Sequence, residues 1–300
     1  MNWKNVLLIG AVTVLPVSMM AQANILNAKK PQEIGLKTEA QKALDNDTPL
    51  AYGYVDDRDI LWSKTIWETI DLDERVNFPL YYPTDTIDIG ADRRSLYDVL
   101  IKNIKNGKLE DVYVDSYFTE KRNFSDLAAT LKKVDTTDYG YEQINAGEQI
   151  SAEYINERQL TAADIEEYRI KGIWYFDKRQ GELKYRLLGI APVAPDVNFI
   201  DDESMDPADS KVELFWVWYP DARKILHEAK VFNQRNSAQP ITFDALLNSR
   251  RFNGVIYRED NVHGDRKVTE YIADNALFQL LEANRIKEVI RDKEQDMWAY

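Results

Sequence analysis

Hydrophobic residues between positions 59 and 83 recur at close to helical spacing. Most of these apolar side chains can share one face of a helix: Ile60, Leu61, Ile66, Trp67 and Ile70. Pro79 disfavours helical backbone at the residue before it, so the predicted helix stops near Asn77 and Phe78. The pattern therefore predicts an amphipathic helix, followed by the extended Pro-Leu-Tyr-Tyr-Pro segment at 79–83.

A second helix and a strand are predicted after this block. Ser95 is expected to cap a helix that runs through Asn106, with Gly107 ending it. The apolar residues of this helix recur on one stripe, which is expected to be buried. Alternating residues then predict a strand over 108–118, and a short helix is expected over 126–133.

Turn-forming residues over 135–147 predict a linker, which we take as a soft boundary between two halves. The second half is expected to hold these elements: a helix over 161–168 opened by a capping box of Thr161 and Asp164, hairpin strands over 172–177 and 183–192, a strand over 212–219, a helix from Pro220 through Ala229, and a C-terminal helix over 268–293.

These elements predict an α+β fold of mixed helices with a short antiparallel sheet and hairpins. Residues 96–113 and 243–257 share an aromatic-Asp-x-Leu helix, an Asn-Gly stop and a strand. Two interpretations remain open: two related α/β units, or a common helix–Gly–strand unit used twice. We divide the chain into four parts: a signal at 1–23, a flexible N-terminal arm at 24–50 with at most a short helix over 34–44, an N-terminal part at 51–145, and a C-terminal part at 146–300.

The first residues have the three parts of a secretory signal. Lys4 supplies the positive region, residues 6–17 the apolar region, and Ala21-Gln22-Ala23 a small-residue cleavage site. Cleavage is expected after Ala23, with cleavage after Ala21 as the alternative. No later apolar run approaches the roughly 20 residues that a spanning helix needs, so the mature protein is predicted to be exported and soluble.

The lack of cysteine and the negative net charge exclude several kinds of site and binding partner. The chain has no cysteine, which excludes disulfides, thiolate metal sites and acylation of a lipobox cysteine. Any membrane association therefore has to come through a partner. The net charge is −13, and loss of Lys4 with the signal leaves 37 basic and 51 acidic residues, or −14. This negative field repels nucleic acid and anionic membrane surfaces.

Motifs for catalysis or metal binding are absent from the sequence. The two histidines, His227 in a predicted helix and His263 in a turn, lack the spacing of metal ligands. No nucleophile elbow or phosphate-binding glycine loop occurs among the 12 glycines. The acidic segment 201–209 lacks calcium-loop spacing and is expected to be a solvated surface loop. We therefore predict no catalytic residue, metal or cofactor.

Aromatic side chains are the remaining functional signal, because aromatics are enriched at protein interfaces. Trp174, Trp216 and Trp218 could stack on a sugar, but tryptophans on strands more often belong to a core or an interface. Aromatic residues and the acidic step at 56–59 supply the candidates for contact with a protein partner: Asp56, Asp57, Asp59, Trp62, Trp67, Tyr81, Tyr82 and Trp298.

The block from 59 to 83 also carries a recognisable order of residues: Trp62, Lys64, Trp67, Ile70, Asp71, Leu72, Glu74, Asn77, Tyr82 and Pro83. This order resembles the GldN/PorN family of the Bacteroidetes gliding and type IX protein-secretion machinery. Members carry a similar D-x-x-W-x-K-x-x-W-x-x-I-D-L…E-x-x-N-x-P-x-x-Y-P sequence. The resemblance extends from about Val55 to the C-terminus.

The resemblance implies a non-enzymatic structural adaptor in the periplasm. Family members associate with a GldK/PorK-type outer-membrane lipoprotein in a ring-like assembly, and they are linked to the GldL–GldM motor through the periplasmic part of GldM/PorM. It implies that this chain self-associates in such a ring and meets the outer membrane through the lipoprotein. Two alternatives stay open: an exported carbohydrate-active enzyme with paired carboxylates, and a ligand-binding module with one large, partly apolar pocket.

Overall fold

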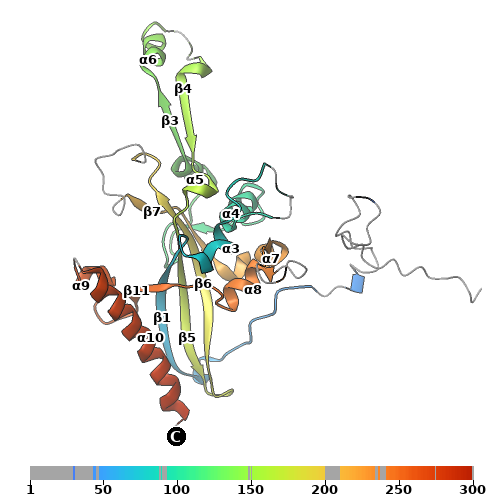
Figure 1. The fold of residues 1–300 in the computed structure, drawn as a ribbon, viewed down its shortest axis with the longest axis vertical. Coiled ribbons are helices and arrows are strands. Elements are labelled where there is room, and N and C mark those ends of the chain that lie inside the picture. Colours follow the sequence, from blue (N-terminus) through green and yellow to red (C-terminus); the bar gives the residue numbers. More distant parts are fainter. Residues whose placement is uncertain are drawn as a thin grey trace, which may run out of the picture. The chain divides into compact units, whose positions relative to one another are not determined.

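An antiparallel sheet organises the compact unit formed by residues Pro49–Tyr300 (Figure 1). The computed structural model describes residues 30, 43–44, 47–87, 89, 93–147, 149, 151–199, 210–233, 236, 241–273 and 275–298, without the side chains at 138, 152 and 298. The expected signal at 1–23, most of the expected helix at 34–44 and the acidic loop at 201–209 lie outside the described residues.

The α-helices are α3 (Phe78–Tyr81), α4 (Leu96–Lys105), α5 (Phe124–Leu131), α6 (Asp138–Asn145), α7 (Tyr219–Glu228), α8 (Phe243–Asn248), α9 (Val268–Tyr271) and α10 (Ala276–Trp298). The strands are β1 (Ile60–Asp71), β2 (Val112–Tyr113), β3 (Lys132–Thr136), β4 (Ile155–Gln159), β5 (Glu167–Asp177), β6 (Glu182–Pro195), β7 (Lys211–Glu213), β8 (Trp216–Trp218), β9 (Lys230–Val231), β10 (Ile241–Thr242) and β11 (Val255–Glu259). Together they give the α+β fold that the sequence predicts.

The main sheet has the order β11-β1-β5-β6-β8-β2, with β7 paired to β6. Strands β1 and β2 come from the expected N-terminal part and the others from the expected C-terminal part, so the two parts share one sheet. The two segments with the echoing pattern, α4–β2 and α8–β11, end in the strands at opposite edges of this sheet. Whether they are related units stays an open prediction.

The helix predicted over 59–77 is wrong, because these residues form the long strand β1. This strand pairs with β5 along its whole length and with β11 over its second half. Ile66 and Trp67 point to opposite faces, as strand geometry requires, yet each is only 1% exposed. Burial on both faces places apolar residues side by side and removes the alternation that marks a half-buried strand. The same clustering imitates helical spacing.

Asn77 and Pro79 begin a helix rather than end one. Asn77 stands at the N-cap position of α3, and Pro79 lies in its first turn, where a missing N–H costs no hydrogen bond. The Asn77 amide donates to the carbonyl oxygens of Asp71 (2.7 Å) and Asn253 (3.1 Å). This buried side chain therefore joins the end of β1 to the segment that precedes β11.

In the first half, the helix predicted from Ser95 to Asn106 is confirmed, whereas the strand predicted over 108–118 is mostly absent. Ser95 Oγ accepts a hydrogen bond from the Asp98 amide at the start of α4 (3.2 Å), and Gly107 follows the helix with a φ of +66°. The strand predicted over 108–118 shrinks to β2, because the chain turns sharply there and Phe118 adopts a φ of +60°.

The β5–β6 hairpin is confirmed and is longer than predicted. The capping box of Thr161 and Asp164 is also present, with the Asp164 carboxylate accepting from the Thr161 amide at 2.7 Å. The helix predicted over 161–168 is wrong, however. It is a single 3₁₀ turn over Ala162–Asp164, since the residues from Glu167 onward belong to β5.

Two further segments differ from the prediction. The linker expected over 135–147 instead contains the end of β3 and helix α6, and β3 pairs with β4 in a two-stranded ribbon. In Figure 1 this ribbon extends away from the end of the main sheet. The C-terminal helix predicted over 268–293 is divided into α9 and α10, and α10 continues to Trp298. Ala283, Ile286 and Ile290 of α10 pack on Ile66 and Ile256 of the sheet.

Buried tyrosine hydroxyls are expected to make the fold sensitive to high pH. Burial raises the pKa of Tyr52 to about 12, and burial also raises the pKa of Tyr185 and Tyr219. An unfolded tyrosine ionises near pH ~10, so the stability present below that pH is lost as the pH rises through the higher folded pKa values. Melting temperatures measured by circular dichroism should therefore fall steadily above pH ~10. Equal melting temperatures at pH 9 and 11 would contradict this account.

Candidate functional site

The acidic candidates lie at the beginning of β1. Asp56 caps the 3₁₀ turn Asp57–Asp59 by accepting from the Arg58 amide, and it also pairs with the Arg58 guanidinium at 3.2 Å. Asp59 lies 3.6 Å from the guanidinium of Arg179 on the β5–β6 turn. Asp57 is exposed and makes no ion pair with any described residue. Of the three, Asp57 is therefore the carboxylate most accessible to a partner.

The aromatic candidates Tyr81 and Tyr82 lie beyond the other end of the strand. Tyr81 donates its hydroxyl to the Ala163 carbonyl (3.1 Å), while Tyr82 is 51% exposed and packs edge-on against Phe78 and Tyr81. Strand β1 has 12 residues at about 3.4 Å each, so its two ends are separated by roughly 37 Å. The predicted site residues therefore form two groups that a single short peptide cannot cover.

Trp62 and Trp67 have different surroundings. Trp62 is half-buried beside the cluster under α10. Trp67 is 1% exposed and lies in a cluster with Ala191 and Trp216 on the other face of the sheet. Trp298 ends α10, and its side chain lies outside the described residues.

Two cations stack on the aromatic rings around Trp67. Lys171 Nζ lies 4.9 Å from the Trp67 ring centre and 4.8 Å from that of Tyr117, and it donates to the Ser116 carbonyl at 2.9 Å. Burial and the nearby Arg258 guanidinium lower the pKa of Lys171. Arg258 itself stacks at 4.7 Å on Trp67. This arrangement stabilises the loop at 115–118 against the sheet.

Carboxylates and histidines form no metal-binding cluster in the part of the chain that the structure describes. No group of three or more His, Asp or Glu side chains there could hold a metal ion. His227 lies on α7 and His263 in an exposed turn. Trp216 is fully buried and Trp174 packs on Tyr185, with ring centres 5.1 Å apart, so these tryptophans form no shared sugar platform.

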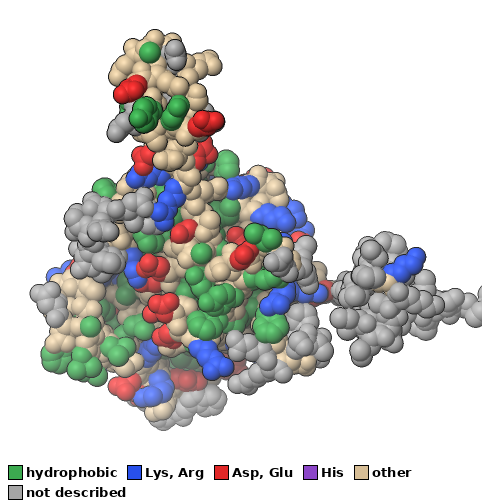
Figure 2. Space-filling model, turned by 45° about the horizontal axis from the view of Figure 1, so that its top comes forward, with side chains coloured by type: hydrophobic (Ala, Val, Ile, Leu, Met, Phe, Trp, Pro, Cys, Tyr) green, Lys and Arg blue, Asp and Glu red, His purple; other side chains and the backbone are tan. Residues whose placement is uncertain are grey.

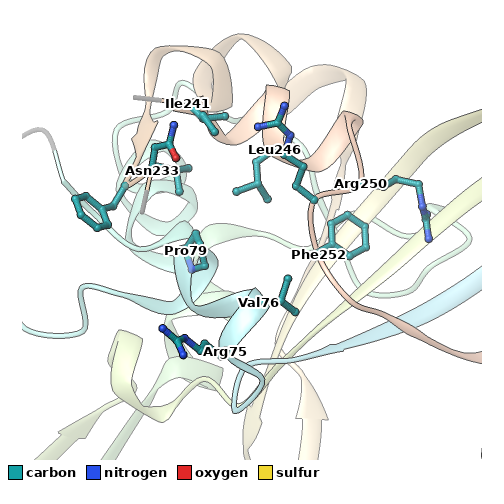
Figure 3. Close-up of a pocket in the computed structure, with 11 residues that line it drawn as sticks. Arg75, Val76, Pro79, Asn233, Ile241, Leu246, Arg250 and Phe252 are labelled. Carbon is teal, nitrogen blue, oxygen red and sulfur yellow. The ribbon is translucent and has the colours of Figure 1, made fainter. Parts of the chain in front are cut away.

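A hollow with a volume of about 660 Å³ lies between α3, α8 and the β9–β10 ribbon (Figure 3). Its walls come from three segments: Arg75, Val76 and Pro79 at the start of α3; Leu246, Arg250, Arg251 and Phe252 at the end of α8; and Val231, Phe232, Asn233 and Ile241 on and beside β9–β10. Figure 3 shows Arg75 on one side and Leu246 on the opposite side, with the Arg250 guanidinium turned away from the hollow. We call this hollow the arginine pocket.

Sequence reasoning missed the arginine pocket because its three walls are far apart along the chain. The one local signal is Arg250-Arg251-Phe252, two cations and an aromatic residue directly after a helix. Arg250 adopts a φ of +50°, and its guanidinium reaches Glu68 in the sheet. Arg250 is consequently an internal ion-pair partner, whereas Arg251 is exposed at the pocket.

The described residues define an α+β protein whose surface carries apolar and charged patches. Within them, no helix has both the length and the apolar character required to cross a membrane. The sequence model of a family described as gliding motility associated protein GldN matches residues 55–299. The match spans most of the chain, so this protein belongs to the GldN family. No relative was found among curated proteins.

Proposed function

We propose that this protein is a non-enzymatic adaptor subunit of the type IX secretion and gliding machinery. The observation that carries this proposal is the GldN family match over residues 55–299. The predicted signal at 1–23 supports export to the periplasm, and the lack of cysteine leaves a protein partner as the means of attachment to the outer membrane. The partners we propose are a GldK/PorK-type lipoprotein, the periplasmic part of GldM/PorM, and further copies of this chain in a ring.

Exposed apolar side chains support a role in assembly. Leu277, Phe278 and Leu281 lie on the first turns of α10 and are each more than half exposed. Tyr139, Tyr141 and Ile144 on α6 are also exposed, and Figure 2 shows hydrophobic side chains at the tip of the projecting ribbon. Exposed apolar patches on soluble domains are typical of protein–protein contacts. The chain therefore has apolar surface at two separate places for different neighbours.

Co-purification from native envelopes tests the adaptor proposal. The tagged full-length chain is expected to bring down an outer-membrane lipoprotein and the periplasmic part of the motor complex after mild solubilisation. The recovered complex should contain several copies of the chain, measured by mass photometry. Recovery of the chain as a free monomer, with neither partner, would overturn the proposal.

Charge reversal at Asp57 tests whether the acidic step contacts the lipoprotein. Asp57→Lys is expected to change the free energy of unfolding by no more than about 0.5 kcal/mol, because the side chain is exposed and unpaired among the described residues. It should reduce recovery of the lipoprotein severalfold. Glu110→Lys, at an exposed position just before β2, is the matched control. Undiminished recovery with Asp57→Lys would remove this segment from the interface and leave the adaptor proposal standing.

A further inference from the structure

The arginine pocket has cationic groups that no described carboxylate neutralises. Arg75 and Arg251 both line the pocket, and both are exposed. Neither forms an ion pair within the part of the chain that the structure describes. Phe232 also lines the pocket, and the guanidinium of Arg93 lies 4.5 Å from its ring centre. The pocket is thus a local positive site on a chain whose net charge is −13.

The lining of the pocket is mixed, with its apolar side chains gathered at the base and along part of the rim. Leu246 and Val231 are nearly fully buried at its base, while Val76 and Phe232 are about half exposed at its rim. Phe252 and the aliphatic stem of Arg250 complete the wall on the side of α8. A volume of about 660 Å³ accommodates a bulky side chain together with part of its peptide backbone.

We propose that the arginine pocket binds an acidic peptide segment of a partner protein, with a bulky apolar side chain of that segment inserted between α3 and α8. The proposal rests on the function proposed above, since it defines the chemistry of one partner segment. Carboxylates of the segment pair with Arg75 and Arg251, whose guanidinium groups suit bidentate contacts. The inserted side chain covers Val76, Leu246 and Phe252.

The apolar part of the lining favours a peptide over a small anion. Inorganic phosphate would neutralise the guanidinium groups but would leave the apolar walls in water, so it uses only part of this surface. A neutral apolar peptide would fill the walls and leave both arginines without a counter-charge. Only a segment with both features matches the whole pocket. The general negative charge of the chain repels acidic partners elsewhere, which concentrates their binding at this site.

Fluorescence polarisation with labelled peptides on the full-length chain tests the proposal. The probe is a short peptide with one phenylalanine flanked by aspartates; one comparison peptide replaces the phenylalanine with serine, and another replaces the aspartates with lysines. The acidic phenylalanine peptide is expected to bind about tenfold more tightly than either. The double variant Arg75→Glu with Arg251→Glu should weaken its binding at least about tenfold.

A second double variant distinguishes specific binding at the arginine pocket from a general effect of net charge. Lys178→Glu with Arg266→Glu changes the net charge equally at exposed positions on the β5–β6 turn and beyond β11, and it should bind the peptide within about twofold of the wild type. Equal losses in both double variants, or equal affinity for the serine peptide, would overturn the proposal. Displacement of the peptide by inorganic phosphate, beyond that by chloride at equal ionic strength, would identify an anion site instead.

Co-purification with the wild-type chain tests the adaptor function separately from the peptide-binding pocket. A chain that retains the lipoprotein or the motor partner but does not bind the acidic peptide refutes the pocket and leaves the adaptor function. A chain that binds the peptide through Arg75 and Arg251 but recovers no partner refutes the adaptor function and leaves the pocket.

Discussion

Replacing Arg250 with alanine is expected to lower the free energy of unfolding by about 3–5 kcal/mol. Arg250 donates two hydrogen bonds to Glu68, at 2.8 and 2.9 Å, and the Glu68 side chain is only 1% exposed. Removing the guanidinium leaves a carboxylate buried in the sheet without a counter-charge. Urea denaturation followed by circular dichroism measures the loss.

Two matched variants identify the cause of that loss. Glu68→Met with Arg250→Met replaces the pair by apolar side chains and should recover most of the stability, because no charge remains buried. Arg250→Lys keeps a positive charge without the two-pronged contact and should fall in between. Arg250 also has a φ of +50°, so Arg250→Gly relieves backbone strain while still orphaning Glu68. If alanine and the double methionine variant are equally unstable, the ion pair is not the source of the effect.

The pair between Glu68 and Arg250 also shows what local sequence cannot reveal about this fold. Short-range signals predict correctly wherever a few neighbouring residues decide the structure, as at Ser95 capping α4 and in the β5–β6 hairpin. Strand β1 depends on partners that lie 96 or more residues away in the chain, namely β5 and β11. Those partners bury both faces of β1, and that burial removes the alternation by which a strand is recognised.

The candidate site was harder to predict than the fold. Sequence reasoning selects residue types, and it selected aromatics because they are common at interfaces. Exposure then separates them, since Tyr82 is at the surface while Trp67 is in the core. The arginine pocket combines side chains from 75–79, 231–241 and 246–252, and no single segment contains enough of it to be recognised. The family itself was predictable because its identifying residues all lie within one short segment, 62–83, which includes most of β1 and continues just past α3.

Trp67→Ala is expected to destabilise the protein by about 3–5 kcal/mol through loss of packing, with no direct effect on a binding surface. The side chain fills the space between Ala191 and Trp216 on one face of the sheet. It also provides the ring on which Lys171 and Arg258 stack, and these cations would lose that contact in a partly buried place. Thermal unfolding should show a lower melting temperature for the variant. Circular dichroism is the suitable probe, because the substitution removes a tryptophan and so changes the fluorescence signal itself.

Two other aromatic substitutions distinguish a packing role for Trp67 from a role in partner binding. Trp67→Phe should cost much less than alanine, because it keeps an aromatic ring and removes an indole N–H that has no hydrogen-bond partner among the described residues. Tyr82→Ala removes two edge-on aromatic contacts at a half-exposed position and should cost about 1 kcal/mol, well below the cost of Trp67→Ala. A Trp67→Ala variant with wild-type stability that no longer retains its partner would reverse this interpretation. Trp67 is one of the residues that identify the family, and its side chain is buried in the sheet. Its substitution should therefore impair assembly only to the extent that it unfolds the protein.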